Sequence, residues 1–187
     1  MKGLPVDCAI IVVDMQNDFA KKTGALYVPK GEKTIPVIKE LLKTAQSKKA
    51  LVVFTMDWHE KNDPEFSRDN WPKHCVKNTR GAKIVSELKP FLKNAKIVKT
   101  NFYDKFQGSK LEAFLKKKRV KKLFFCGLAT EYCVKFTALT AKKLGFEVFI
   151  VRNAIKPVNC HCGRAVLREL SGKGIRIIFL KSAKNSI

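Results

Sequence analysis

The fold is indicated first by a short apolar stretch near the N-terminus, Cys8-Ala9-Ile10-Ile11-Val12-Val13, which ends directly at Asp14. A run of this length without polar alternation is typical of a strand that is buried on both faces of a sheet. Further apolar runs predict strands at residues 51–56, 96–98, 123–126, 146–151 and 175–180. The pattern therefore predicts a sheet of six buried strands.

Amphipathic segments separate these strands and predict helices. In the first of them, one helical face collects Ile35, Ile38, Leu41, Leu42 and Ala45. Comparable patterns cover residues 82–92, 109–118, 131–144 and 163–170, and two glycines, Gly145 and Gly174, stand where a left-handed residue would end a helix. Because strands and helices alternate, we expect a three-layer α/β/α fold with a six-stranded parallel sheet and right-handed crossovers, a Rossmann-like topology.

The length and composition of the chain fit one such domain. The 187 residues contain no internal repeat or linker, so we predict a single domain over residues 1–187. Hydrophobic residues make up 45% and charged residues 29%, which excludes a disordered chain and a membrane protein. The first residues, Met-Lys-Gly-Leu-Pro-Val-Asp, lack the apolar region of a signal peptide, so we expect a cytoplasmic location.

The charge of the chain is strongly basic. It carries 38 Lys and Arg against 16 Asp and Glu, a net charge of +22, which makes nucleic acid the first partner to consider. The lysines are scattered, however, without interleaved aromatic residues and without zinc-finger or helix-turn-helix spacing. We interpret them as solvated helix faces, and we expect no specific nucleic-acid or membrane partner. Weak binding to polyanions at low salt follows from the charge alone.

Six cysteines would suit three disulfide bridges in a small secreted protein. Here Cys8 and Cys126 lie in or beside apolar strand-like runs, and no secretion signal is recognisable. We therefore predict free thiols in a reducing compartment. The stretch Cys160-His161-Cys162 resembles half of a metal site, but no second pair has the matching spacing, so we interpret it as structural.

Polar residues mark the ends of several predicted strands. The first strand ends at Asp14, the second at Asp57 and the third at Lys99, and the fourth leads to Cys133 in the first turn of the next helix. Each residue alone has an ordinary interpretation as a turn, surface or core residue. Because ligands of open α/β sheets bind at the carboxyl ends of the strands, their occurrence together favours an active site.

These residue types suit nucleophilic catalysis by a thiol. A helix N-terminus and a nearby ammonium both favour the thiolate of Cys133. A carboxylate within reach can take the thiol proton and return it to a leaving amine. Backbone amides of the turn from Ala129 to Cys133 would face the developing oxyanion.

The long segment at residues 57–80 offers metal ligands. Asp57 and His59 fall on the same side at the end of the second strand, and His74 returns later in the segment. Two imidazoles and a carboxylate suit a divalent transition metal, to which Glu65 would add an oxygen ligand. By spacing alone, the interpretation as ordinary polar loop residues stays open, and it holds for most Asp-x-His pairs.

Four motifs together resemble the nicotinamidases of the isochorismatase-like cysteine hydrolase superfamily. They are Val13-Asp14-Met15-Gln16-Asn17-Asp18-Phe19, Asp57-Trp58-His59, Trp71-Pro72-Lys73-His74-Cys75-Val76 with Thr79-Arg80-Gly81-Ala82 behind it, and Gly127-Leu128-Ala129-Thr130-Glu131-Tyr132-Cys133-Val134. The resemblance spans residues 7–180. The second and third motifs are the ones most specific to nicotinamidases.

The resemblance implies a role for each matching residue. The catalytic residues would be the base Asp14, its cationic partner Lys99 and the nucleophile Cys133. The metal ligands would be Asp57, His59 and His74, with Glu65 at a place where relatives carry either histidine or glutamate. The ion would be divalent, with zinc expected first and iron or manganese as alternatives. Thr100 departs from the glycine that usually follows the family's lysine, and Glu131 replaces a common aspartate.

The same resemblance implies a substrate pocket. A cis peptide would precede Ala129, and the amides of Ala129 and Cys133 would form the oxyanion hole. The substrate-binding residues would be Phe19 and Trp71, flanking a pyridine ring, together with Gln16 and Leu128. The pyridine nitrogen would enter the coordination shell of the metal.

The activity implied is hydrolysis of nicotinamide to nicotinate and ammonia through a cysteine thioester, a step of NAD salvage. Pyrazinamide would also be accepted, and homo-oligomerisation is left open. Two alternatives remain at this point: another amidase or hydrolase of the superfamily, or a catalytically inactive relative that binds polyanions. Release of ammonia from nicotinamide would distinguish the implied activity from both alternatives.

Overall fold

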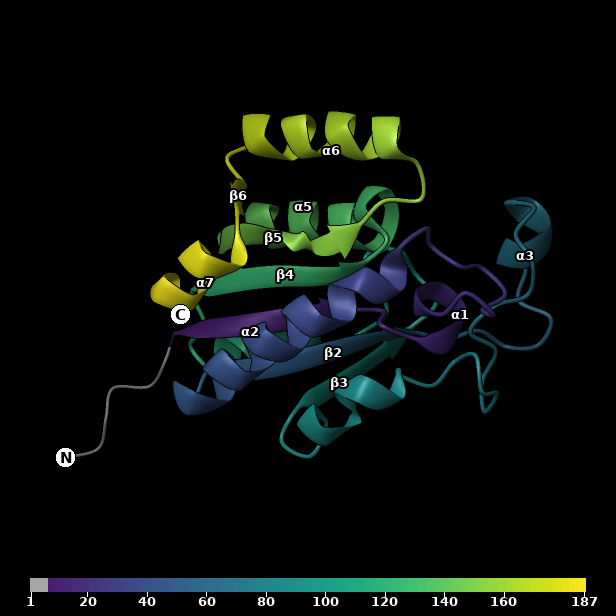
Figure 1. Ribbon diagram of the computed structural model, residues 1–187, viewed down its shortest axis with the longest axis horizontal. Helices are drawn as coiled ribbons and strands as arrows, with labels where there is room; N and C mark the ends of the chain where they lie inside the picture. Colours follow the sequence, from purple (N-terminus) through teal and green to yellow (C-terminus); the bar gives the residue numbers. More distant parts are fainter. Residues whose placement is uncertain (1–6) are drawn as a thin grey trace.

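The computed structural model describes residues 7–187, and Figure 1 shows a single parallel sheet with helices on both faces. Residues 1–6, on which the expected absence of a signal peptide depends, lie outside the described residues. Within residues 7–187, no helix combines the length and apolar character needed to cross a bilayer. All six cysteines are free thiols, as predicted.

The sheet has six parallel strands in the order β3-β2-β1-β4-β5-β6, which is the Rossmann order. Its strands are β1 (Cys8–Val13), β2 (Leu51–Asp57), β3 (Lys96–Thr100), β4 (Lys122–Leu128), β5 (Glu147–Lys156) and β6 (Arg176–Ile178). The strand order reverses direction between β1 and β4, and ligands of such sheets bind outside the carboxyl ends at this point. The predicted fold class is confirmed.

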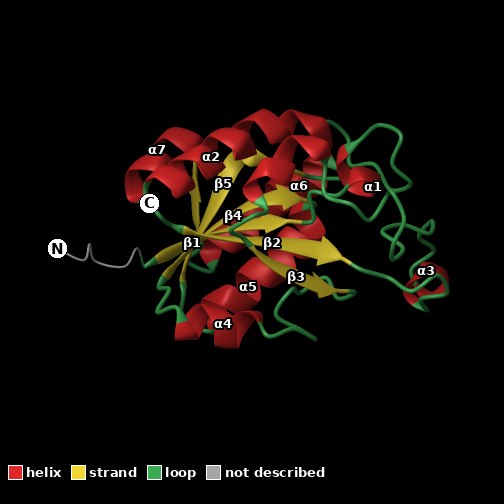
Figure 2. Cartoon of the chain, turned by 90° about the horizontal axis from the view of Figure 1, so that it is seen from below, coloured by secondary structure: helices red, strands yellow, loops and turns green. Residues whose placement is uncertain are grey.

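Two core layers sandwich the sheet, because successive side chains of β1 point to opposite faces. Ile10 and Val12 pack on the layer that contains α2 (Ile35–Ser47) and α7 (Leu180–Ser186). Ile11 packs on the other layer, which contains α4 (Leu111–Lys117), α5 (Lys135–Lys143) and α6 (Cys160–Gly172). Figure 2 shows α2 and α7 on one side of the sheet and α4 and α5 on the other.

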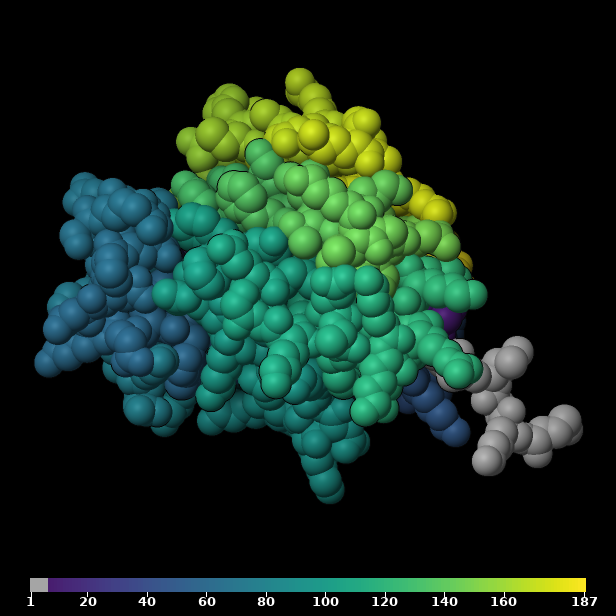
Figure 3. All heavy atoms as spheres, turned by 180° about the vertical axis from the view of Figure 1, so that it is seen from behind, coloured from purple at the N-terminus to yellow at the C-terminus, as the bar shows by residue number. Residues whose placement is uncertain are grey.

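Short elements fill the connections at the carboxyl edge. They are α1 (Asn17–Ala20), α3 (Glu65–Arg68) and the 3-10 turns Gly31–Thr34 and Ser86–Phe91. The long connection after β2 carries α3 and projects as a lobe from one end of the molecule, drawn in blue in Figure 3. This lobe brings the second half of the predicted metal site back to the sheet.

Three predicted elements differ in the structure. The helix expected at 82–92 is reduced to the 3-10 turn Ser86–Phe91, because residues 83–85 pair with the 15–17 segment: the Asn17 amide donates to the Lys83 carbonyl at 2.9 Å, and the Val85 amide donates to the Met15 carbonyl at 3.0 Å. The helix expected at 131–144 is interrupted at Tyr132 (φ −113°, ψ −109°) and continues as α5. The last strand ends at Ile178, and α7 begins two residues later.

Both predicted helix-ending glycines are confirmed. Gly145 follows α5 with φ of +88° and Gly174 follows α6 with φ of +75°. These left-handed conformations favour glycine, which has no Cβ to clash with the backbone.

Candidate active site

Three of the predicted residues meet at the carboxyl edge of the sheet. Asp14 follows β1, Asp57 is the last residue of β2, and Cys133 lies in the turn Thr130–Val134 after β4. All three side chains are buried. The Asp14 carboxylate accepts a hydrogen bond from the Thr55 hydroxyl at 2.6 Å, which holds it at the strand junction.

A buried ammonium joins the two carboxylates, and it belongs to Lys105. Its Nζ lies 2.9 Å from Oδ2 of Asp14 and 3.1 Å from Oδ1 of Asp57, and the side chain is fully buried. The Lys105 amide donates to the Thr137 hydroxyl at 3.1 Å, and its carbonyl accepts from Ser109 at 2.7 Å. The segment after β3 is thereby anchored to α5 and presents its lysine to the site.

Lys99, the lysine predicted for this place, lies elsewhere. It is an exposed residue of edge strand β3, and its Nζ sits 4.0 Å from the centre of the Trp58 ring. Because side chains alternate along a strand, the buried neighbours Val98 and Thr100 point away from the face that Lys99 occupies. The prediction for Lys99 is wrong as to position, and the cation beside Asp14 comes from six residues further along the chain.

Burial and charge set the protonation states of this cluster. Burial raises the pKa of the Cys133 thiol well above its ordinary value, although the Lys105 ammonium acts in the opposite direction. Burial likewise raises the pKa of Asp14, with Lys105 opposing. Burial would lower the pKa of Lys105, but Asp14 and Asp57 outweigh it and raise that pKa. Burial therefore favours the protonated thiol of Cys133, which lies near the contact between Lys105 and Asp14.

Asp57, His59 and His74, the predicted metal ligands, lie together as a candidate metal cluster. One ligand atom from each lies within 4.8 Å of the others, and all three residues are buried. Nε2 of His59 is 2.8 Å and Nε2 of His74 is 3.3 Å from Oδ2 of Asp57. Two imidazole nitrogens and a carboxylate oxygen thus converge on one point.

The other ring nitrogens of both histidines face acceptors. Nδ1 of His74 hydrogen-bonds the Pro72 carbonyl at 2.8 Å, and Nδ1 of His59 lies 3.1 Å from Oδ2 of Asp63, a close contact without hydrogen-bond geometry. Asp63 is itself held by the Asn101 amide at 3.0 Å. Metal-binding histidines are commonly oriented by such an acceptor on the second nitrogen, so that Nε2 is directed toward the ion.

The surroundings of the cluster also fit a cation. Oε1 of Glu65 is buried without a hydrogen-bond partner among residues 7–187. Burial, and then the negative charge of Asp57, raise the pKa of Glu65. Glu65 and Asp57 thus bring carboxyl oxygens together in the interior, and a divalent ion would give both of them a partner. The donor set of nitrogen and oxygen atoms suits a borderline ion such as zinc.

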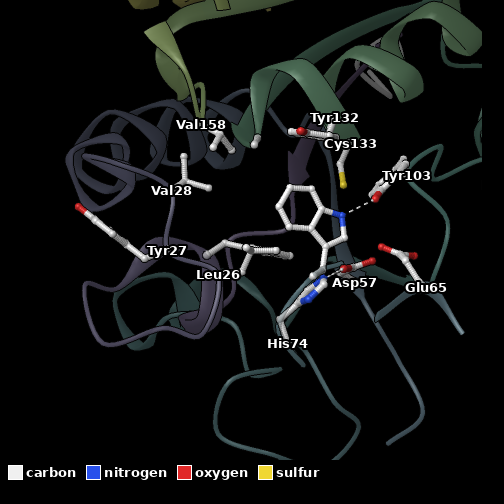
Figure 4. Close-up of a pocket in the computed structure, with 13 residues that line it drawn as sticks. Leu26, Tyr27, Val28, Asp57, Glu65, His74, Tyr103, Tyr132, Cys133 and Val158 are labelled. Atoms are coloured by element: carbon white, nitrogen blue, oxygen red, sulfur yellow. Dashed lines mark hydrogen bonds and ion pairs between the residues drawn. The ribbon is translucent and has the colours of Figure 1, made fainter. Parts of the chain in front are cut away.

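A pocket of about 510 Å³, mouth included, opens onto both clusters. Its lining comprises Phe19, Leu26, Tyr27, Val28, Asp57, Glu65, Trp71, His74, Tyr103, Ala129, Tyr132, Cys133 and Val158. Figure 4 shows the sulfur of Cys133 directed into the pocket, with Asp57, Glu65 and His74 on the opposite side. The Trp71 indole donates to the Tyr103 hydroxyl at 3.0 Å, which fixes it across the pocket. A flat ring placed here would lie between the thiol and the metal cluster.

Two residues predicted to bind substrate do not reach this pocket. Gln16 is fully buried, donates to the Asp57 carbonyl at 2.7 Å and accepts from the Asp57 amide at 2.8 Å, so it positions the end of β2. Leu128 is also fully buried in the core. The predicted cis peptide between Leu128 and Ala129 is present, and Ala129 lines the pocket.

A family model described as an isochorismatase domain matches residues 8–180. The chain belongs to the isochorismatase family. It is 30% identical to the nicotinamidase of Saccharomyces cerevisiae over 190 residues, covering 80% of this chain and 88% of that protein. It is 32% identical to the nicotinamidase of Escherichia coli K12 over 183 residues, covering 81% and 84%.

The fold of a solved family member is closely similar. The pyrazinamidase of Pyrococcus horikoshii, crystallised in complex with zinc, superposes with a TM-score of 0.87. That structure is 41% identical, and the match covers 92% of this chain and 99% of that one. This isochorismatase domain therefore retains almost the whole architecture of that relative.

Sequence reasoning missed three polar residues of the site. Lys105, Asp63 and Tyr103 all lie in connections that have no strand or helix periodicity. Asp63 could have been found from its position four residues after His59, because a carboxylate there can orient the imidazole. For Lys105 and Tyr103 no local signal exists, because the route of the connection decides where each points.

Proposed function

We propose that this protein is a nicotinamidase that hydrolyses nicotinamide to nicotinate and ammonia, as a step of NAD salvage. The observation that carries the proposal is the meeting of the Asp14, Lys105 and Cys133 cluster with the Asp57, His59 and His74 cluster across one pocket. The names of the relatives, nicotinamidases and a pyrazinamidase, support the same substrate class.

The first step is acylation of the thiol. The Cys133 sulfur attacks the carboxamide carbon as its proton passes to the carboxylate of Asp14, which acts on the pKa of the thiol from close by. Because the thiol is protonated when buried, this transfer is needed to create the nucleophile. Asp14 then gives the proton to the departing amine, the carbon–nitrogen bond breaks, and ammonia leaves a thioester on Cys133.

The second step is hydrolysis of the thioester. Asp14 takes a proton from water as the water oxygen attacks the thioester carbon. The carbon–sulfur bond then breaks, and Asp14 returns this proton to the leaving sulfur, which gives the carboxylic acid and the thiol and restores the carboxylate. Lys105 keeps a positive charge against Asp14 throughout, at 2.9 Å. The backbone amides of Ala129 and Cys133, both of which line the pocket, would stabilise the oxyanion of each step.

Asp57, His59 and His74 would hold a divalent ion, with Glu65 beside them. When bound, the ion would supply a Lewis-acid contact for the pyridine nitrogen and so orient the ring. Phe19 and Trp71 line the pocket as apolar walls for that ring. This placement turns the carboxamide toward the Cys133 sulfur, and positioning of this kind is a large part of catalysis.

The proposal is tested by an ammonia-release assay with nicotinamide on the metal-loaded protein, with nicotinate identified by chromatography. The expected result is stoichiometric formation of both products. If ammonia is released only from other amides, the fold supports a different amidase. If no amide is hydrolysed, the chain is an inactive relative.

Benzamide is expected to be a much poorer substrate than nicotinamide. It has the same shape and the same scissile bond, but carbon replaces the ring nitrogen, so the orienting contact is lost. Sites built around one polar contact discriminate by about 10² or more, and we expect this ratio in kcat/KM. Pyrazinamide keeps a nitrogen at the equivalent place and should be accepted. Equal rates for benzamide and nicotinamide would show that the metal cluster does not hold the ring.

The three histidines of the chain provide a test of the metal cluster. His74→Ala removes a ligand and is expected to lower the bound metal, measured by elemental analysis after dialysis, to near background. His161→Ala is the matched control, because His161 is exposed on α6, and it should keep the full metal content. Asp63→Asn should weaken metal affinity by about 10–100-fold through the orientation of His59. Equal metal content in all variants would contradict the assignment.

A further inference from the structure

One residue of the connection between β5 and α6 belongs to the pocket of the proposed amidase site. The connection spans residues 157–159, and of these three residues Val158 alone lines the pocket. Figure 4 shows Val158 beside Val28, on the side of the pocket away from Glu65. Val28 is buried, whereas Val158 is 41% exposed, so Val158 stands at the mouth. A ring bound in the pocket would therefore cover the apolar side chain of Val158.

The carboxylate of Glu131 holds this connection. Its Oε2 accepts a hydrogen bond from the Val158 amide at 3.1 Å, and its Oε1 accepts one from the Asn159 amide at 2.8 Å. Within residues 7–187 Glu131 forms no ion pair, so these two bonds place its carboxylate. Hydrogen bonds from amides to an ionised carboxylate are stronger than those between neutral groups.

These two bonds are distinct from the cap of α6. The cap is Asn159, whose side-chain oxygen accepts from the amides of His161 and Cys162 at 2.9 and 3.2 Å. Glu131 acts on the amides of the two residues that precede the helix. Removal of the Glu131 carboxylate should therefore loosen the connection while α6 keeps its cap.

Glu131 lies in the same turn as the proposed nucleophile. It stands two residues before Cys133, within the turn Thr130–Val134. The Ala129 carbonyl closes this turn by accepting two amide hydrogen bonds, both at 3.2 Å. A single side chain thus connects the backbone that carries the nucleophilic sulfur to the backbone of Val158 at the pocket mouth.

We propose that Glu131 is a positioning residue for substrate binding, because it fixes Val158 against the aromatic ring of the amide. This inference rests on the proposed function. Glu131 itself does not line the pocket, so its effect on the substrate must pass through Val158 or through the turn. An apolar wall contacts the ring in the ground state and the transition state alike, so its displacement should weaken binding without slowing the chemical step.

Amide hydrogen exchange tests the two hydrogen bonds without any substrate. In Glu131→Ala, the Val158 and Asn159 amides should exchange about tenfold faster than in the parent, measured for each residue by NMR. The His161 and Cys162 amides should keep their parental rates, since Asn159 still caps α6. Unchanged exchange at the first pair, or faster exchange at all four amides, would overturn the proposal.

A double-variant cycle tests whether the effect on the substrate passes through Val158. Nicotinamide binding is measured on the metal-loaded Cys133→Ala protein, so that no turnover is required. Glu131→Ala and Val158→Ala should each raise the dissociation constant by about tenfold, and the double variant should also stay near about tenfold. A rise of about a hundredfold in the double variant would show that the two residues act independently, and it would overturn the proposal.

Turnover separates this role from an effect on the nucleophile. With Cys133 in place, Glu131→Ala should raise the KM for nicotinamide by about tenfold and keep kcat within about twofold of the parent. A large fall in kcat at unchanged KM would assign Glu131 to the chemical step and overturn the proposal.

Glu169→Ala is the matched control. Glu169 is an exposed carboxylate that joins α6 to Lys135 of α5 at 2.7 Å, and it lies outside the pocket. Its exchange rates, nicotinamide affinity and kinetics should remain parental. A parent that neither binds nicotinamide nor releases ammonia would refute the proposed function. A parent that hydrolyses nicotinamide, with Glu131→Ala behaving like Glu169→Ala, would overturn this inference alone.

Discussion

Cys133→Ala is expected to abolish turnover of nicotinamide, with kcat lowered by roughly 10⁴–10⁶. Without the sulfur no thioester can form, and neither Asp14 nor Lys105 is placed to replace it as a nucleophile. The residue lies at a turn on the pocket wall, so the thermal midpoint should change little. Steady-state ammonia release and circular dichroism provide the two measurements.

Cys162→Ala is the matched control for this variant. Its thiol is exposed on α6 and does not line the pocket, so activity should stay at the parental value. The kcat of Asp14→Asn should be lowered nearly as much as that of Cys133→Ala, since an amide can neither take the thiol proton nor return one to ammonia. If Cys133→Ala retains activity within about tenfold of the parent, the covalent mechanism is wrong.

The second large effect is expected from a pair of lysine variants. Lys105→Met should lower kcat/KM by about 10³ or more, because it removes the positive charge that holds Asp14 and Asp57 together. It should also destabilise the fold by about 3–5 kcal/mol, since two buried carboxylates lose their partner. Lys99→Met, by contrast, changes an exposed residue and should stay within about threefold of the parental activity.

Lys105→Arg provides a second variant in case Lys105→Met does not fold. It keeps the charge but not the compact ammonium, so the chain should fold while activity remains low. Thermal unfolding identifies the folded variants before kinetics are compared. A severe loss in Lys99→Met together with near-parental activity in Lys105→Arg would show that the catalytic cation is Lys99 after all.

Much of the fold could be predicted because its signals are local. The apolar run Cys8–Val13 has no polar position, so it can only be buried on both faces, and the structure places it in the middle of the sheet. Parallel strands bring their carboxyl ends to one edge, so Asp14 and Asp57 are neighbours there. The histidines of the metal cluster follow from their motifs at the same edge.

The predictions that failed concern segments whose conformation depends on distant partners. The 82–92 stretch has a helical pattern, yet hydrogen bonds to the 15–18 segment draw its first residues into an extended course. Gln16 has the polarity of a substrate ligand, yet its amide is taken up by the backbone of Asp57. In both cases a contact across the chain outweighed the local preference.

The sequence by itself determined the fold class, and it picked out the strand-end carboxylates, the thiol and the candidate metal ligands, because each follows from periodicity or from a motif. Only the tertiary structure decided which lysine serves the site. Lys99 and Lys105 are both near the end of β3, and strand alternation directs the first outward to Trp58. The chain then folds back against Thr137, and this closure buries the second lysine between two carboxylates whose charge compensates its desolvation.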